Sequence, residues 1–279
     1  MKNIDKKVVY DFGEEWEKYS QNISSQTISR NDLKNAWNQY FHIFPFDDLK
    51  EGSQGFDMGC GSGRWAKFVA NKVHILNCID PSEKALNVAK KNLSKFSNIN
   101  FYNASINDEV LKRNSQDFGY CLGVLHHIPN TLDGIKACSK LLKKDAPFLM
   151  YLYYNFENRP FLFKLIWRVS NLIRKFLSSL PSGIKGLITV IIAYLIYFPL
   201  ARFALLCHKL GVNVANFPLT DYKDKPFYFM KTDALDRFGT RLEKRFSKQD
   251  IIDMLTVSGF KDIKFSEGNP CWVCISKKA

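Results

Sequence analysis

The sequence lacks the ligand set of a structural zinc site and the leader of a secreted protein. No second cysteine pair accompanies Cys271 and Cys274 to complete the four ligands of a zinc site. These two cysteines also lie in a predicted strand, where residues three apart point to opposite faces. The other cysteines of the seven are scattered, and Met1–Tyr10 does not resemble a signal peptide. We therefore expect no metal site and a reducing, cytoplasmic setting.

Acidic residues are missing from a long central segment. Residues 159–219 contain no Asp or Glu but eight basic residues, namely Arg159, Lys164, Arg168, Arg174, Lys175, Lys185, Arg202 and Lys209. The whole chain of 279 residues has 40 basic and 27 acidic residues, a net charge of +13. Such an excess favours an anionic partner, which could be a membrane surface, a nucleic acid or a phosphorylated substrate.

Short apolar runs alternate with helical stretches from Gln54 to Tyr154, which predicts βαβ units and a parallel sheet. We expect strands at 55–58, 73–79, 99–102, 118–122 and 147–153, and two closing strands at 261–266 and 271–276. Helices are predicted at 63–71, 82–93, 131–142 and 247–257, with a turn at 267–270. The expected fold is an α/β sheet of seven mostly parallel strands with helices on both faces.

The same pattern divides the chain into three parts. Residues 1–50 are predicted to form an N-terminal helical cap that Pro45 ends. Residues 51–155 and 245–279 form the sheet core. Residues 156–244 interrupt the core after the fifth strand and are predicted to form a helical lid or substrate domain.

A glycine-rich loop follows the first predicted strand and opens the first helix. Its sequence is Asp57-Met58-Gly59-Cys60-Gly61-Ser62-Gly63. Glycines allow a tight turn and the close approach of a ligand to the backbone. The spacing is G-x-G-x-G, whereas the dinucleotide fingerprint is G-x-G-x-x-G. Asp57, directly before the loop, could meet the cationic group of an amino acid.

Asp80 ends the second predicted strand, 23 positions after Asp57. A carboxylate at this edge of a parallel sheet can accept both hydroxyls of a ribose. Asp80 could equally belong to the start of the next helix, because Pro81 and Ser82 supply helix-start residues.

Three motifs in this order resemble those of class I S-adenosylmethionine-dependent methyltransferases. They are Asp57–Gly63, Ile79-Asp80-Pro81-Ser82 and Leu122-Gly123-Val124-Leu125-His126-His127-Ile128-Pro129. The resemblance covers residues 54–154 well and the closing strands loosely, and it implies the Rossmann-like fold of that family. Residues 233–241, with the insertion before them, are similar to a bacterial, functionally uncharacterised subgroup of these enzymes.

The resemblance implies S-adenosylmethionine as cofactor. It places the methionine part beside the three loop glycines and the ribose at Asp80. Ala104 and Ser105 stand where the family often has an acidic residue near the adenine. The implied cofactor-binding residues are Asp57, Gly59, Cys60, Gly61, Gly63, Asp80, Pro81, Ala104, Ser105, Leu122 and Gly123.

His126 and His127 follow the fourth strand, where the carboxyl ends of the sheet form the expected cleft. An imidazole there could remove a proton from a hydroxyl or thiol acceptor. The alternative is that one histidine packs against the sheet and the other caps the next helix. Tyr151, Tyr153 and Tyr154, at the end of the fifth strand, are expected to line the substrate pocket.

The insertion begins with an amphipathic pattern. At 100° per residue, Lys164, Arg168 and Lys175 share one face, and apolar residues between Phe161 and Phe176 fill the opposite one. This pattern is typical of a helix in an anionic membrane interface. The alternative is a lid over the active site with a merely solvated basic face. The following run, Gly186–Ala201, is broken by Pro199 and is too short to span a bilayer on its own.

These observations predict a methyltransferase that modifies an oxygen of a small or lipid-linked acceptor in the cytoplasm, with an anionic membrane surface as a further partner. Sulfur or nitrogen acceptors are the alternative. Members of the resembled family that methylate the exocyclic amines of bases carry an Asn/Asp-Pro-Pro-aromatic tetrad after strand four. This chain has Leu122–Leu125 there, so a nucleic-acid substrate is disfavoured. The rivals are a nicotinamide-dependent oxidoreductase and a non-catalytic membrane-docking protein. The oligomeric state is left open.

Overall fold

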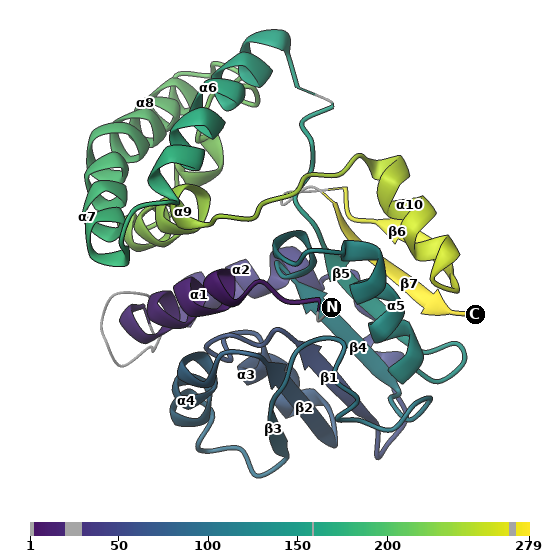
Figure 1. The fold of residues 1–279 in the computed structure, drawn as a ribbon. Coiled ribbons are helices and arrows are strands. Elements are labelled where there is room, and N and C mark those ends of the chain that lie inside the picture. Colours follow the sequence, from purple (N-terminus) through teal and green to yellow (C-terminus); the bar gives the residue numbers. More distant parts are fainter. Residues whose placement is uncertain (1–2, 20–29, 158, 268–271) are drawn as a thin grey trace. The chain divides into compact units, whose positions relative to one another are not determined.

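The computed structural model describes residues 3–19, 30–157, 159–267 and 272–279 (Figure 1). The chain forms two compact units. Unit 1 comprises Met1–Asn22, Leu33–Asn155 and Leu242–Ala279, and unit 2 comprises Ile23–Asp32 and Phe156–Arg241. Each unit is described by itself.

Unit 1 contains the seven-stranded sheet that the sequence predicts. Its strands are β1 (Gln54–Met58), β2 (Ile75–Asp80), β3 (Ile99–Asn103), β4 (Phe118–Leu122), β5 (Pro147–Tyr151), β6 (Phe260–Phe265) and β7 (Val273–Lys278). Its helices are α1 (Lys6–Lys18), most of α2 (Arg30–Phe41), α3 (Ala66–Val69), α4 (Glu83–Asn92), α5 (Thr131–Leu141) and α10 (Lys248–Val257), with short turns η2 (Phe46–Asp48), η3 (Ala70–Lys72) and η4 (Leu125–His127).

The strand order is β3-β2-β1-β4-β5-β7-β6, and β1 to β5 pair in parallel while β7 runs antiparallel to β5 and β6. The order reverses between β1 and β4, because β2 and β3 lie on one side of β1 and β4 and β5 on the other. In open α/β sheets, ligands bind at the carboxyl ends of the strands beside such a reversal.

Helices cover both faces of the sheet (Figure 1). On one face, α5 and α10 pack on Phe56, Cys121 and Phe148. On the other, α2, α3 and α4 pack on Cys78 and Tyr120. The strands are apolar on both sides because both faces are covered. The fold class predicted from the sequence is confirmed.

Local signals fix where several helices begin. Ser82 caps α4, its hydroxyl accepting the amide of Ala85 at 3.4 Å. Ser247 and Asp250 form a reciprocal capping box at the start of α10. The predicted helix at 63–71 is shorter than expected, since α3 spans four residues before η3 continues it. The expected turn at 267–270 and Cys271 lie largely outside the described residues.

Unit 2 is helical. It contains α6 (Phe161–Leu177), α7 (Ser182–Ile192), η5 (Ala193–Tyr197), α8 (Phe198–Lys209), η6 (Thr220–Tyr222) and α9 (Phe227–Gly239). A small core joins these elements and contains Leu177, Tyr197, Met230, Ala234 and Phe238. Among the described residues, one continuous helix, Ser182–Lys209, is long and apolar enough to cross a membrane by length and composition alone.

The expected break at Pro199 is wrong. The π-helical turn η5 ends two residues before Pro199, and the amide of Phe198, which follows it, donates to the carbonyl of Ala193, five residues back. This wider turn accommodates the ring and the missing donor of proline, which disrupt an ordinary helical turn. The apolar segment is therefore one helix of 28 residues and not the short run expected.

Candidate functional site

The glycine loop connects β1 to α3 and closes tightly. The amides of Gly59 and Cys60 both donate to the carbonyl of Ile79, at 2.8 and 3.2 Å. Gly59, Gly61 and Gly63 all have positive φ, at 79°, 53° and 76°. A Cβ atom at Gly59 would lie 2.3 Å from a methyl carbon of Val124. The loop conformation therefore requires glycine for its dihedral angles and, at Gly59, also for space.

Asp80 joins this loop to the start of α4. Its carboxylate accepts the amide of Gly61 at 2.9 Å and the amide of Ser82 at 2.8 Å. Burial raises the pKa of Asp80 to about 6, although these two hydrogen bonds act in the opposite direction. Asp80 therefore supports the start of α4 and also lies beside the glycine loop. The structure is compatible with both roles predicted for it, at the helix start and at the ligand loop. Pro81 follows between Asp80 and the cap Ser82.

Asp57 lies beneath the loop at the end of β1. The hydroxyl of Tyr120, directly across on β4, donates to its carboxylate at 2.9 Å. Burial raises the pKa of Asp57 to about 8, against the lowering effect of the Tyr120 hydrogen bond and with a smaller raising effect of the neighbouring Asp80. A cationic ligand group would relieve this cost, because an opposite charge favours the ionised carboxylate.

Ala104 and Ser105 follow β3 at the same edge of the sheet. The amide of Ala104 donates to the carbonyl of Asp80 at 3.2 Å. The amide of Ser105 donates to the carboxylate of Asp108 at 2.8 Å. The buried hydroxyl of Ser105 has no hydrogen-bond partner among the described residues. Asp108 thus brings a carboxylate to a position where the sequence motif lacked one, and only the loop geometry reveals it.

Leu122 and Gly123 end β4. Gly123 has φ of 78°, and its amide donates to the carbonyl of Tyr151 at 3.3 Å. No atom of the described protein lies within 4 Å of the position where a Cβ would stand. The backbone conformation, not crowding by other side chains, requires glycine here, and space remains beside it.

Helix α1 covers the glycine loop, which the sequence did not indicate. The indole nitrogen of Trp16 lies 2.9 Å from the position of a Cβ on Gly61. The Arg64 guanidinium lies over the Trp16 ring at 5.3 Å. Lys84 of α4 forms ion pairs with Glu14 and Glu17 of α1. Trp16, a large aromatic residue in a predicted N-terminal helix, is the sequence signal that could have indicated this contact.

The two histidines lie together in η4, after β4. His126 is completely buried, and its ring stacks on Tyr153 with 3.8 Å between centroids. Neither ring nitrogen of His126 has a hydrogen-bond partner among the described residues. Burial, with smaller contributions from His127 and Arg245, holds the pKa of His126 well below its usual value. His126 is therefore neutral at physiological pH.

His127 has a defined orientation. Its Nδ1 lies 2.7 Å from the carbonyl oxygen of Leu242, and its ring is 5.0 Å from that of Phe12. A carbonyl accepts only, so Nδ1 carries the proton in this contact and Nε2 is left as the basic nitrogen. This is the tautomer that a general base needs when a second group fixes its ring.

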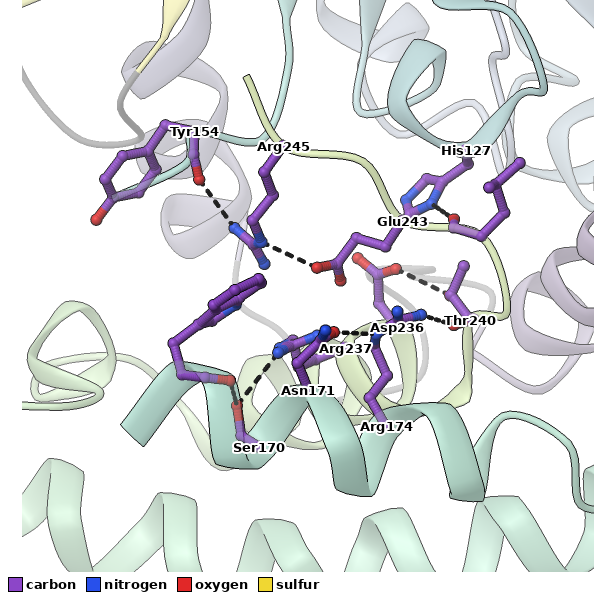
Figure 2. Close-up of polar contacts among 12 residues, drawn as sticks. His127, Tyr154, Ser170, Asn171, Arg174, Asp236, Arg237, Thr240, Glu243 and Arg245 are labelled. Carbon is purple, nitrogen blue, oxygen red and sulfur yellow. Dashed lines mark hydrogen bonds and ion pairs between the residues drawn. The ribbon is translucent and has the colours of Figure 1, made fainter. Parts of the chain in front are cut away.

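A segment that we call the clasp, Leu242–Phe246, holds the histidine and tyrosine segments together and was not identified from the sequence. The amide of Lys244 donates to the carbonyl of His126 at 3.0 Å, and the amide of Phe246 to that of Tyr153 at 2.9 Å. Arg245 donates to the carbonyl of Tyr154 at 3.2 Å and forms an ion pair with Glu243 at 2.9 Å (Figure 2).

The structure brings two of the three tyrosines to the histidines. Tyr151 and Tyr153 lie with ring centroids 6.2 and 3.8 Å from that of His126. Tyr154 instead packs edge-on against Trp272, 5.8 Å away. The fifth strand ends at Tyr151 and not at residue 153, because the clasp pairs with Tyr153 and Tyr154 in place of a sheet neighbour.

The expectation that the chain has no metal site concerns Cys271 and Cys274, of which the structure describes one. Cys271 lies outside the described part of the chain. Among the residues that are described, no group of three or more His, Cys, Asp or Glu side chains could hold a metal ion.

Part of the sheet core is similar to a known protein family. The methyltransferase domain family matches residues 56–150, the segment that holds the glycine loop, Asp80 and the strands around them. Residues 56–150 of this chain are therefore similar to methyltransferase domains. The family implies S-adenosylmethionine as the methyl donor.

Curated relatives match the methyltransferase domain in part. A ubiquinone biosynthesis O-methyltransferase of Coxiella burnetii is 31% identical over 114 residues, which cover 40% of this chain and 46% of the relative. One from Vibrio atlanticus is 29% identical over 136 residues, covering 47% and 54%. The chain thus spans about half the length of the curated relatives it matches.

A solved structure shows the same fold along most of the chain. A methyltransferase from Thermotoga maritima aligns with a TM-score of 0.51 at 13% identity, covering 96% of this chain and 99% of that protein. At this identity the likeness concerns the fold alone, and it agrees with the sheet order and the helices on both faces.

Proposed function

We propose that this chain transfers the methyl group of S-adenosylmethionine to an oxygen of a small or lipid-linked acceptor. The observation that carries the proposal is the pair of buried carboxyl groups, Asp57 and Asp80, at the carboxyl ends of adjacent strands beside the glycine loop. The partial similarity to O-methyltransferases of ubiquinone biosynthesis supports the acceptor class. Sulfur and nitrogen acceptors are the alternative.

The residues at this edge of the sheet fit the cofactor. Asp57 offers a carboxylate for its cationic amino group, and Asp80 offers one for the ribose hydroxyls. The loop glycines and Gly123 leave backbone without side chains for a close approach, and Asp108 supplies an acidic group beside Ser105 for the adenine amine. When bound, S-adenosylmethionine supplies a methyl group that is already activated by its sulfonium.

The protein then has to orient an acceptor and, for a hydroxyl, remove its proton. We assign the base to His127, whose Nδ1 contact with Leu242 leaves Nε2 to take the proton. His126 is a weaker candidate, since its depressed pKa makes it a poor base at neutral pH. With Tyr151 and Tyr153, His126 instead forms an aromatic wall beside His127.

We further propose that the cytoplasmic enzyme meets an anionic membrane surface, where a lipid-linked acceptor would reside. The eight basic residues and the lack of acids in 159–219 support this partner. The role of residues 156–244 as a lid stays a prediction.

The cofactor assignment is tested by ligand-induced stabilisation. S-adenosylhomocysteine should raise the melting temperature, as any ligand of the native state does. Asp80→Ala should remove most of this shift, and Asp262→Ala, on an exposed part of β6, should retain it. The measurement is differential scanning fluorimetry with S-adenosylhomocysteine and with NAD. Stabilisation by NAD and not by S-adenosylhomocysteine would contradict the proposal in favour of an oxidoreductase.

The role of His127 is tested by turnover. An acceptor is first found by screening phenolic and lipid-linked hydroxyl compounds for the mass gain of a methyl group. His127→Ala should then lower kcat by roughly 10²-fold or more, the usual contribution of a general base, and change the pH profile. Affinity for S-adenosylhomocysteine should stay the same. Normal turnover with an unchanged pH profile would show that positioning alone suffices. His74→Ala is the control, because His74 is exposed and directly precedes β2, at the opposite end of that strand from Asp80.

A further inference from the structure

Exposed apolar side chains are concentrated in unit 2. In the described part of unit 1, the large apolar residues that are exposed are Tyr10, Val110 and Val257. In unit 2 they occur along the whole of α6 and of the helix Ser182–Lys209. They include Phe161, Leu162, Leu165, Ile166, Val169, Leu172, Ile173, Phe176, Ile184, Leu187, Ile191, Leu195, Phe203 and Leu206. A water-soluble protein rarely exposes apolar surface of this extent without a partner.

Helix α6 is oriented opposite to a surface helix of a soluble protein. Three of its polar residues, Ser170, Asn171 and Arg174, face the interior of unit 2, where Arg174 donates to Asn171 and Thr240 and Ser170 accepts a bond from Arg237 of α9 (Figure 2). Its apolar stripe faces outward, with Leu172 and Phe176 each 67% exposed. A soluble helix buries the apolar stripe and exposes the polar one.

The helix Ser182–Lys209 repeats this arrangement. Apart from Tyr197, the residues that it buries are small or polar, including Lys185, Thr189, Ala193 and Ala201, spaced four or eight apart. They form the side that packs against α9. Only 22% of the most apolar stretch of the helix is buried. Its large aliphatic side chains therefore point away from the rest of unit 2.

The basic residues of unit 2 serve two purposes. Arg174 and Lys185 are buried and donate to carbonyls at the end of α9, and Arg159 and Arg202 also donate to carbonyls within the unit. Arg168, Lys175 and Lys209 remain exposed. No acidic residue lies between 159 and 219 to oppose an anionic surface.

We infer that unit 2 inserts the apolar faces of α6 and Ser182–Lys209 into one leaflet of an anionic bilayer, and that apolar burial, not charge, holds it there. Burying one Leu or Phe side chain contributes more free energy than one basic residue near a salt-screened surface. Only three of the eight basic residues are exposed and not engaged by a described contact, whereas the exposed apolar residues are many. This differs from the salt-sensitive adsorption that the composition alone suggests.

The helix lies in the leaflet and does not cross it. Helix α9 packs along its buried side and carries Asp233 and Asp236. A transmembrane position would bring these carboxylates to the depth of the hydrocarbon, where ionised groups are costly. An interfacial position leaves α9 on the aqueous side.

The test is flotation of the full chain with phosphatidylcholine vesicles, with and without phosphatidylglycerol, at low salt and at about 0.5 M NaCl, where surface charges are screened. We expect binding to both vesicles, tighter to the anionic ones, and retained at high salt. The triple variant Leu162→Asn/Leu172→Asn/Phe176→Asn should bind both at least 10²-fold more weakly. Arg168→Gln/Lys175→Gln should lose only a few-fold, on anionic vesicles at low salt. Val257→Asn, an exposed apolar residue of unit 1, is the matched control.

Three results would overturn the inference. Wild-type binding that is confined to anionic vesicles and lost at high salt would show adsorption by charge. Unchanged binding of the triple variant, with an unchanged circular dichroism spectrum and melting temperature, would show that this surface is not used. A dimer that ignores vesicles and that the triple variant makes monomeric would show that a second copy covers it.

The inference rests on the proposed function only for its link to a lipid-linked acceptor, and the two can fail separately. S-adenosylhomocysteine stabilisation is measured on the same samples. Vesicle binding without this stabilisation would refute the methyltransferase proposal alone. Stabilisation without vesicle binding would refute the docking alone.

Discussion

The two units bury charge of opposite sign. Unit 1 buries Asp57 and Asp80, and burial raises the pKa of both carboxyl groups. Unit 2 buries Arg174 and Lys185, which donate to the carbonyls that end α9. A cation suits the carbonyl end of a helix, because its unpaired carbonyls carry partial negative charge. The buried cations are thus hydrogen-bonded within the fold, whereas the buried acids lie in the site that we propose for the cofactor.

The largest effect should come from removing a buried cation of unit 2. Arg174→Met keeps most of the apolar volume but leaves the backbone carbonyls of Thr240 and Arg241 and the side-chain Oδ1 of Asn171 without this donor. We expect unit 2 to lose about 3 kcal/mol of stability, the usual cost of breaking a buried charged network. Urea denaturation and limited proteolysis within 156–241 measure it.

The matched control is Arg168→Met, which removes an exposed cation from the same helix and should change stability little. Stabilisation by S-adenosylhomocysteine, a property of unit 1, should survive in both variants. Equal stability of the two variants would contradict the claim that the buried Arg174 stabilises unit 2.

A smaller effect, of opposite sign, should come from neutralising a buried acid of unit 1. Because the folded protein raises the pKa of Asp57 from 3.8 to about 8, the native state holds its proton more tightly than the unfolded chain. Stability without ligand should therefore be fully present below pH 4 and fall as the pH rises toward 8. Asp57→Asn retains an acceptor for Tyr120 and removes this loss, so we expect it to be more stable than the wild type at pH 8 and to differ less from it at pH 5.

Urea denaturation of both proteins at pH 5 and pH 8, without ligand, measures the difference. The same variant should lose affinity for S-adenosylhomocysteine, since the carboxylate for the amino group is gone. If the variant is less stable than the wild type by the same amount at both pH values, Asp57 stabilises the fold as Arg174 does.

Local sequence accounted for much of unit 1. The alternation of apolar runs and helical stretches predicted the seven strands, because strands covered on both faces need continuous apolar runs. The glycine spacing and Asp80 predicted a ligand loop, since positive φ at Gly59, Gly61 and Gly63 is a local property of the chain. Strand ends were less well predicted, because β5 stops where the clasp replaces its neighbour.

Contacts between segments that are distant in the sequence could not be predicted from local patterns. Trp16 reaches the glycine loop, and Leu242 orients His127 across more than a hundred residues. Asp108 is close in sequence to Ser105, but only the turn between them brings its carboxylate to the Ser105 amide. These roles depend on three-dimensional neighbours that no motif records.

The sequence by itself determined that α6 has an apolar and a basic face, because residue spacing fixes the direction of each side chain around a helix. The tertiary structure decided which face meets the rest of unit 2. Arg174 turns inward because the carbonyl end of α9 needs donors, and this leaves Leu172 and Phe176 outside. Amphipathicity gives two faces, but only packing against a second element chooses between them.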